Sequence, residues 1–432
     1  MEKGNLDPRL RVIQDAALDG KIVLLRVDHN VVKKGKITDP YRIDATIPTL
    51  YDIAARGGRP VLMTHVGRPK DKKTGKITCR DAESVDSIVE YLKKKLPVNI
   101  HSQTFPVDPE KGIVQVDGVM DSALDDLRGG KIDIIYLPNI RWFAGEEAEG
   151  PERDAFAQSL AALGDLYVND AFGSWRAHAS TYDVATRLPA YAGWLLQKEL
   201  LNLHRVLEPE KPFVAVVAGA KYDTKIGPLK ALHEKVDHLI LGGLMYNTFL
   251  SAKYNVPIKG VPDSDKELAQ ELVDMDRAHQ KILEMPLVVE SDHPDRREDG
   301  AYRPLQVDDL TKRESVHYLL DVDPRSLETS RVRDGIGSAK TLFVNAVMGM
   351  MPQYPEGSRA LYEAVAANTE AMKLLAGGDT LQVFKELCPG PYMAGLDDPQ
   401  SYYFTGGGSV LSAIKQGTPY GLKPVDVLME DS

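Results

Sequence analysis

The sequence predicts an α/β protein made of two doubly wound, Rossmann-like domains, each with a parallel sheet, joined by an interdomain helix. β-like and helix-like segments alternate along the whole chain, which is typical of parallel sheets covered by helices on both faces. At 432 residues the chain is also too long for one ordinary domain. Glycine-rich turns follow strand-like runs in its second half, and parallel sheets bind ligands at the carboxyl ends of their strands.

The elements of the first half come from this alternation of apolar runs and helical periodicity. The expected strands are Lys21–Val27, Pro60–His65, Ile132–Leu137 and Leu166–Asn169. The expected helices are Asp44–Ala55, Ala82–Lys95 and Glu152–Leu163.

The second half repeats the same rhythm. The expected strands are Phe213–Val217, His238–Leu241, Thr341–Val344 and Met372–Leu375. The expected helices are Thr224–Lys235, Met245–Ala252, Asp265–Leu283, Ser358–Asn368 and one that begins at Asp379.

The predicted domain boundary lies at residues 191–207, which have helical periodicity and end at the break Glu208–Pro212. We therefore expect one domain from residues 1–190 with the tail 418–432, and a second from residues 208–417. A helix that joins two domains would serve as a lever for closure. The charged segments Lys70–Lys76 and His293–Arg303 are expected to be solvated loops.

Composition excludes several classes of protein. The net charge of −10 argues against general nucleic-acid binding. The two cysteines, Cys79 and Cys388, lie far apart without metal-ligand neighbours, so we expect neither a disulfide nor a zinc site, and a cytoplasmic location. No apolar stretch reaches membrane-spanning length, and the first residues lack the apolar core of a signal peptide.

Two kinds of motif indicate phosphate ligands. Ala376–Thr380 and Thr405–Ser409 place glycines between a strand and a helix, where bare backbone N–H groups and the helix N-terminus attract anions. Two such turns in one half of the chain suggest a polyphosphate. The first half carries arginines in strand-end motifs, as expected for binding a small phosphorylated acid; these are Arg26, Arg42, Arg68, Arg141 and Arg176.

Taken in order, the motifs resemble those of the phosphoglycerate kinase family. The resemblance extends from about Lys21 to Leu411 and includes the family's RVDxN, SHLGRP, VNDAFG, RAHAST, GGDT and TGGG patterns. The matching segments are Arg26–Asn30, Ile37–Ile43, Thr64–Pro69, Asn139–Trp142, Val168–Gly173, Arg176–Thr181, Gly219–Ile226, Gly377–Thr380 and Thr405–Ser409.

The resemblance implies transfer of a phosphoryl group between 1,3-bisphosphoglycerate and ADP, giving 3-phosphoglycerate and ATP, by a monomer with Mg²⁺. The first domain would bind the acid through Asp28, Asn30, Arg42, His65, Arg68, Arg141 and Arg176. The second would bind the nucleotide through Gly219, Lys221, Lys225, Gly243, Asn345, Gly377, Gly378, Asp379 and Thr380, with Gly407 also at the phosphates and Asp379 as the Mg²⁺ ligand.

The chemistry supports this division of the site independently. In the ATP-consuming direction the nucleophile is a carboxylate, which is already ionised, so the site needs alignment and charge neutralisation rather than a general base. Arginine suits this task because its planar fork binds phosphate bidentately and stays charged. We expect Arg42 to contact the moving group from the acid side and Lys225 from the other, with Gly378 and Gly407 completing the catalytic set.

The nucleoside side departs from the family pattern. Val347 and Pro352 replace a proline and the glutamate that holds the ribose, while Leu244 and Tyr246 add bulk where the base should lie. Three hypotheses follow. The chain is an ATP/ADP enzyme with a modified pocket, or it uses the same acid with a non-adenine nucleotide or a nucleoside-free phosphate partner such as pyrophosphate, or it is a non-catalytic binding relative. His29 replaces an aromatic residue and is interpreted as a packing residue, and Trp175 as structural.

Overall fold

The computed structural model describes residues 6–116, 118–219, 222, 225–295, 297–299 and 302–430. The chain divides into two compact units, Met1–Leu201 with Tyr420–Ser432, and Asn202–Pro419. The division between Leu201 and Asn202 falls inside helix α6 (Trp194–Leu207), the segment expected to join the domains. The boundaries 1–190 with 418–432, 191–207 and 208–417 stay a prediction.

Unit 1, the first of these, is built on six parallel strands in the spatial order β5-β6-β4-β1-β7-β8. Their bounds are β1 Ile22–Val27, β4 Arg59–Met63, β5 Ile100–Ser102, β6 Ile134–Tyr136, β7 Leu166–Asp170 and β8 Ala190–Ala192. Every residue of β1 and β7 is buried, which is why these strands appear in the sequence as nearly continuous apolar runs. Leu25 of β1 lies opposite Leu62 of β4 and Val168 of β7.

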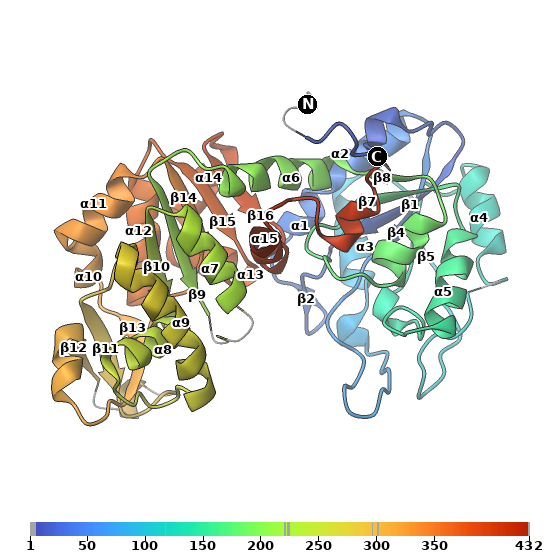
Figure 1. The fold of residues 1–432 in the computed structure, drawn as a ribbon. Helices are drawn as coiled ribbons and strands as arrows, with labels where there is room; N and C mark the ends of the chain where they lie inside the picture. The colour runs from blue at the N-terminus through green and yellow to red at the C-terminus, as the bar shows by residue number, and fades with distance from the viewer. Residues whose placement is uncertain are drawn as a thin grey trace. The chain divides into compact units, whose positions relative to one another are not determined.

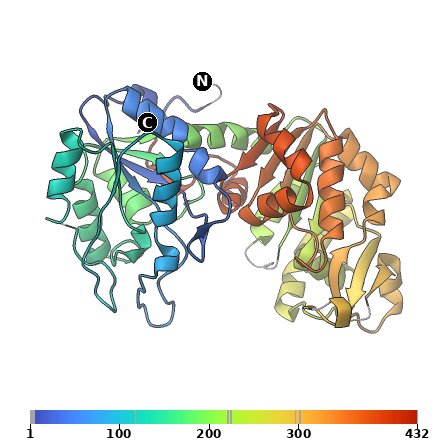
Figure 2. The ribbon, with the colours of Figure 1, turned by 180° about the vertical axis from the view of Figure 1, so that it is seen from behind.

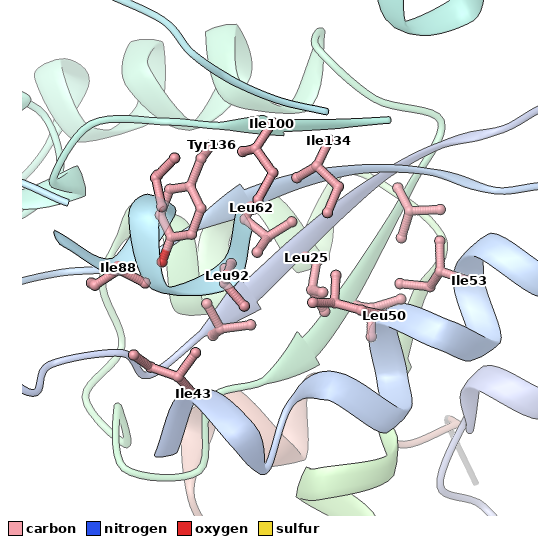
Figure 3. Packing of buried hydrophobic residues seen from close by; sticks show 14 of the residues in the cluster. Leu25, Ile43, Leu50, Ile53, Leu62, Ile88, Leu92, Ile100, Ile134 and Tyr136 are labelled. Carbon is pink, nitrogen blue, oxygen red and sulfur yellow. The ribbon is translucent and has the colours of Figure 1, made fainter. Parts of the chain in front are cut away.

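Helices cover both faces of this sheet. They are α1 Tyr41–Asp44, α2 Ile47–Ala55, α3 Asp86–Lys95, α4 Asp121–Arg128, α5 Pro151–Ala161 and α16 Lys423–Asp426. Figure 3 shows Leu25 and Leu62 on the face where Leu50 of α2 and Leu92 of α3 pack. The blue α2 and α3 lie in front of this sheet in Figure 2, and α5 belongs to the opposite face seen in Figure 1.

One predicted helix, Asp44–Ala55, is interrupted. It begins only at Ile47, after the short helix α1, because the Thr46 hydroxyl donates to the Ile43 carbonyl at 2.8 Å and Pro48 has no N–H to continue the ladder. This break sets Arg42 on α1, directly after the two-residue strands β2 (Val32–Lys33) and β3 (Lys36–Ile37).

Residues 420–430 belong to unit 1 although they follow unit 2 in the sequence. Asn169 of β7 donates to the Pro424 carbonyl at 2.9 Å, and Arg11 donates to the Leu428 carbonyl through its backbone N–H at 3.1 Å. Leu10 and Met429 form an antiparallel bridge. The segment is therefore an integral part of the first unit.

Unit 2 contains five parallel strands in the order β10-β9-β14-β15-β16. Their bounds are β9 Phe213–Ala218, β10 His238–Gly242, β14 Thr341–Asn345, β15 Met372–Ala376 and β16 Ser401–Phe404. The helices are α7 Ile226–Lys235, α8 Gly243–Tyr254, α9 Asp263–His279, α10 Arg325–Glu328, α11 Ser330–Ser338, α12 Glu356–Ala367, α13 Gly378–Leu387, α14 Pro389–Asp397 and α15 Gly407–Gln416. α7 lies in front of the sheet in Figure 1, and the orange-to-red helices α12 and α13 lie in front of it in Figure 2.

Two features of unit 2 differ from the sequence prediction. Helix α9 ends at His279 rather than Leu283, because the Asp276 carboxylate accepts the backbone N–H groups of Lys281 (2.8 Å) and Ile282 (3.0 Å) and turns the chain. The other is a small antiparallel sheet of β12, β11 and β13 (Arg303–Gln306, Leu287–Ser291 and Tyr318–Val322).

This small sheet corrects part of the expected loop His293–Arg303. Arg303 belongs to β12 and pairs at 3.0 Å with Glu290 of β11, whose carboxylate is buried and also accepts the His317 N–H at 3.0 Å. A buried carboxylate needs such partners, so the ion pair favours a strand over a solvated loop. None of the described helices is both long and apolar enough to span a bilayer.

Candidate active site

In unit 1 the acid-binding motifs lie at the carboxyl ends of neighbouring strands. Asp28 follows β1, His65 lies two residues beyond β4, and β4 and β7 flank β1 on its two sides. The chain changes direction across the sheet at β1, and this is where an α/β sheet forms a ligand crevice.

Arg42 and Asp28 form the first pair of this site, with Arg42 Nη1 3.2 Å from Asp28 Oδ2. The Asp28 carboxylate is buried, and its other oxygen, Oδ1, has no hydrogen-bond partner among the residues described. A buried carboxylate oxygen without a donor is costly. It therefore suits a hydroxyl group of a bound substrate.

The loop after β4 is held by side chains from two other strand ends. Asn30 Oδ1 accepts the Gly67 N–H at 3.0 Å, and Arg141 Nη1 donates to the Gly67 carbonyl at 2.7 Å. Asn139 binds both the N–H and the carbonyl of Val66, at 3.0 and 2.7 Å. Predicted residues from three motifs thus meet around one loop.

Arg68 and Arg176 are exposed, and neither side chain hydrogen-bonds to the other five predicted acid-site residues in the part of the chain that the structure describes. The Arg176 guanidinium lies 5.7 Å from the centre of the Trp175 ring, which gives Trp175 a supporting contact. The structure brings together Asp28, Asn30, Arg42, His65 and Arg141, and leaves these two arginines at the surface.

His29 is a buried structural residue, as interpreted from the sequence, and it is fully hydrogen-bonded. Its Nδ1 lies 2.8 Å from the Tyr136 hydroxyl and its Nε2 lies 2.9 Å from Thr46 Oγ1. The Thr46 hydroxyl donates its hydrogen bond to the Ile43 carbonyl, so it can only accept one from His29. The ring proton of His29 is therefore on Nε2. Burial lowers the pKa of His29 to about 3.

Replacing His29 with phenylalanine should change how stability depends on pH. Below about pH 6.5 His29 is protonated in the unfolded chain, but in the folded protein it stays neutral down to about pH 3. Protonation therefore favours the unfolded state, and His29 lowers the free energy of unfolding of the wild type as the pH falls. Between pH 7.5 and 5 the wild type should lose about 2 kcal/mol more than His29→Phe.

Urea unfolding at both pH values, followed by tryptophan fluorescence, measures this difference for unit 1, since Trp142, Trp175 and Trp194 all lie there. His293→Phe, at an exposed histidine, is the control and should follow the wild type. Equal pH dependence of the wild type and His29→Phe would contradict the burial argument.

Lys225 is the central cation of the second unit. It lies just before α7, and its Nζ donates to the Ala218 carbonyl at the end of β9 at 2.6 Å and approaches Asn345 Oδ1 at 3.4 Å. Burial lowers the pKa of Lys225, and the nearby Asp379 opposes this shift. The sequence therefore folds Lys225 over the carboxyl ends of β9 and β14.

The two glycine turns meet at Asn345. Gly377 has a φ of +106°, and a Cβ on Gly407 would lie 2.7 Å from the Gly377 Cα and 3.0 Å from Asn345 Nδ2. Asn345 Nδ2 donates to the Ala376 carbonyl at 2.6 Å, which fixes the turn that contains Gly377. Only glycine allows this close approach, and it leaves backbone N–H groups of α13 and α15 at one edge of the sheet.

Asp379, the expected Mg²⁺ ligand, is exposed in the first turn of α13, between the exposed Gly378 and the buried Thr380 of the expected nucleotide site. The described residues contain no group of three or more His, Cys, Asp or Glu side chains that could hold a metal. A single exposed carboxylate beside a phosphate cradle fits Mg²⁺, because this ion keeps several waters and shares phosphate oxygens. Lys221 lies outside the described residues.

The expectation that Tyr246 fills the base pocket is wrong. Its ring is buried, and its hydroxyl donates to the Met285 carbonyl at 3.0 Å and accepts the Met285 N–H at 2.8 Å, so it belongs to the interior of unit 2. Leu244 and Val347 remain partly exposed and Pro352 is exposed. Gly219 and Gly243 lie together, with the Gly219 carbonyl accepting the Met245 N–H at 3.2 Å.

Sequence reasoning missed a buried group behind the acid site, made of Glu146 and Ser180 together with Arg26, which had been assigned only to anion binding. Arg26 is 2% exposed and its Nη2 lies 3.2 Å from His65 Nδ1. One sign was available: Arg26 interrupts the otherwise apolar run of β1.

Comparison with known proteins accords with this arrangement. The phosphoglycerate kinase family model matches residues 13–416. Phosphoglycerate kinase of Dictyoglomus turgidum is 35% identical over 411 residues, covering 93% of this chain and 95% of the relative. That of Methylorubrum populi is 38% identical over 413 residues, covering 93% and 94%.

Among solved structures, phosphoglycerate kinase of Coxiella burnetii is similar with a TM-score of 0.72 and 28% identity, covering 97% of this chain and 98% of that one. The enzyme of Pyrococcus horikoshii, at 22% identity and a TM-score of 0.74, shares the fold over 97% and 98% of the two chains. The predicted fold class and enzyme class are confirmed, and the non-catalytic reading is set aside. The chain belongs to the phosphoglycerate kinase family, and its activity is the phosphoryl transfer that the family name describes.

Proposed function

We propose that unit 1 binds 3-phosphoglycerate through Asp28, Asn30, Arg42, His65, Arg68, Arg141 and Arg176, and that unit 2 binds Mg-ADP or Mg-ATP. The observation that supports nucleotide binding by unit 2 is the cradle of Gly377, Gly407 and Asn345 beneath Lys225. For the acid it is the ion pair of Arg42 with Asp28, whose free oxygen suits a substrate hydroxyl.

In this mechanism the protein aligns the two substrates and neutralises the charge of the phosphates, and it does not act as a general acid or base. Arg42 binds the transferred group beside the acid, and Lys225 neutralises the phosphate chain of the nucleotide. The N–H groups of Gly378 and Gly407, at the N-termini of α13 and α15, bind phosphate oxygens. When bound by Asp379, Mg²⁺ would add charge neutralisation on the phosphates.

Asp379→Asn should raise the Mg²⁺ concentration needed for half-maximal activity by about tenfold or more, because an amide binds this hard cation less strongly than a carboxylate. Titration of initial rates with MgCl₂ at constant ADP measures the shift. Asp397→Asn changes an exposed acid at the end of α14 and is the control. An unchanged Mg²⁺ dependence in Asp379→Asn would remove the metal assignment.

A nucleoside-free phosphate partner such as pyrophosphate is the second candidate, favoured by Pro352. An exposed proline offers no side-chain acceptor for ribose hydroxyls, while Gly377, Gly407 and Asn345 of the proposed phosphate cradle lie together. Separate calorimetric titrations with ADP, GDP and pyrophosphate, each with Mg²⁺ and 3-phosphoglycerate present, distinguish the candidates. Saturable binding of ADP supports the first, and binding of pyrophosphate without ADP binding supports the second.

The remaining features of this proposal are a monomeric state and a cytoplasmic location. Sedimentation equilibrium of the purified chain tests the first, since a monomer should give a mass near 47.7 kDa. A mass of twice this value would contradict it.

A further inference from the structure

A buried charged network lies behind the acid site of unit 1. Side chains along a strand alternate between the two faces of a sheet. Leu25 and Val27 of β1 pack into the core shown in Figure 3, so Arg26 between them belongs to the opposite face. Arg26 is only 2% exposed, and a buried guanidinium needs a partner for each of its nitrogen atoms.

Each nitrogen of Arg26 has such a partner. Nε donates to the Ser180 hydroxyl at 2.9 Å, and Nη1 donates to the Val27 carbonyl. Nη2 lies 3.2 Å from Nδ1 of His65. The side chain is therefore fixed, and one of its N–H groups points at the histidine assigned to the acid.

This contact determines where His65 carries its proton. Arginine can only donate, so Nδ1 of His65 must accept and cannot hold a hydrogen. Burial, followed by the charges of Arg141, Arg26 and Arg42, lowers the pKa of His65 and keeps the ring neutral. The single ring proton must then be on Nε2, which has no hydrogen-bond partner among the residues described.

The other end of the network balances the charge of Arg26. The Ser180 hydroxyl accepts a hydrogen bond from Arg26 and donates one to Glu146 Oε1 at 2.7 Å. The Ser180 backbone N–H donates to Glu146 Oε2 at 2.9 Å. Burial raises the pKa of Glu146 to about 7, and Arg26 opposes that shift. Because both oxygens of Glu146 accept hydrogen bonds from Ser180, the geometry favours the ionised carboxylate as the buried counter-ion of Arg26.

We propose that Arg26 is a positioning residue, which fixes His65 in the Nε2–H form so that the acid site presents a neutral, pre-oriented N–H donor to its substrate. Glu146 and Ser180 hold Arg26 in place for this task. Each of its three nitrogen atoms already has a protein partner, so we expect Arg26 to act on the ligand through His65. The proposal depends on the assignment of His65 to acid binding.

Long-range ¹H–¹⁵N correlation spectra of the histidine rings in the ligand-free protein test the tautomer directly. The His65 signals are assigned by their loss in His65→Gln. The wild type should show the Nε2–H pattern, and an Nδ1–H or charged pattern would overturn the proposal without any further variant.

The matched pair of variants is Arg26→Met with Glu146→Gln, and Glu146→Gln alone. The double change removes the donor to His65 without leaving an unpaired buried carboxylate, while the single change keeps Arg26. The double variant should show mixed tautomers of His65 and a KM for 3-phosphoglycerate raised about tenfold, with kcat changed much less. Glu146→Gln should keep the Nε2–H form.

The two assignments fail in different ways. If the double variant keeps the pure Nε2–H form, Arg26 does not position His65. If its tautomers mix while the KM for 3-phosphoglycerate stays at that of Glu146→Gln, His65 does not contact the acid and that part of the proposed function fails. Should the double variant not fold, the wild-type tautomer decides.

Discussion

Arg42→Ala should lower kcat by on the order of 10²–10³, which is about 2.7–4 kcal/mol of lost transition-state stabilisation. The reason is that a planar, permanently charged fork beside the transferred group is lost. Arg42 is mostly buried and already oriented by Asp28 at 3.2 Å, so little conformational entropy is lost when it is arranged for the reaction.

The measurement is steady-state kinetics at saturating 3-phosphoglycerate and MgATP, with circular dichroism to verify folding. Arg42→Lys keeps the charge without the fork and should be intermediate. Arg128→Ala is the control, since Arg128 also forms an ion pair with an aspartate, at 3.3 Å to Asp125, but at an exposed site. A kcat near that of the wild type in folded Arg42→Ala would rule out the proposed role.

Lys225→Met should give a loss of similar size, on the order of 10²–10³ in kcat. Its Nζ lies over the Ala218 carbonyl and Asn345, at the carboxyl ends of two neighbouring strands. Methionine keeps the length of the side chain and removes only the charge and the donors. The KM for 3-phosphoglycerate should change little, because the acid is assigned to unit 1.

Lys230→Met tests the same substitution on α7, the helix that Lys225 directly precedes, at a lysine paired with Glu271 on the surface. It should leave kcat within about twofold, because such surface pairs contribute little. Equal effects of the two substitutions would show that the loss comes from α7 and not from the ammonium group of Lys225.

Much of the fold and the site could be predicted because local sequence decides it. β1, β7 and β9 are buried along their whole length, so their apolar runs are visible without tertiary information. The glycine turns were predictable because a close backbone approach, such as that of Gly407 to Gly377, admits no other residue.

The features that sequence could not predict depend on partners far away in the chain. Arg26 lies 154 residues from Ser180, so the strand could be predicted but not the network. β12 depends on the pairing of Arg303 with Glu290, and α9 ends where Asp276 captures two backbone N–H groups. The buried position of Tyr246 was also not predictable, because it depends on hydrogen bonds to the backbone of the distant Met285.

Residues 420–430 also have a consequence for biosynthesis. A ribosome makes Asn202–Pro419 as one uninterrupted stretch, and domains generally fold as units during synthesis. The Asn169 amide and the backbone of Arg11, made much earlier, find their partners Pro424 and Leu428 only after that stretch is complete. The first unit can therefore form these contacts only after the second unit has been translated.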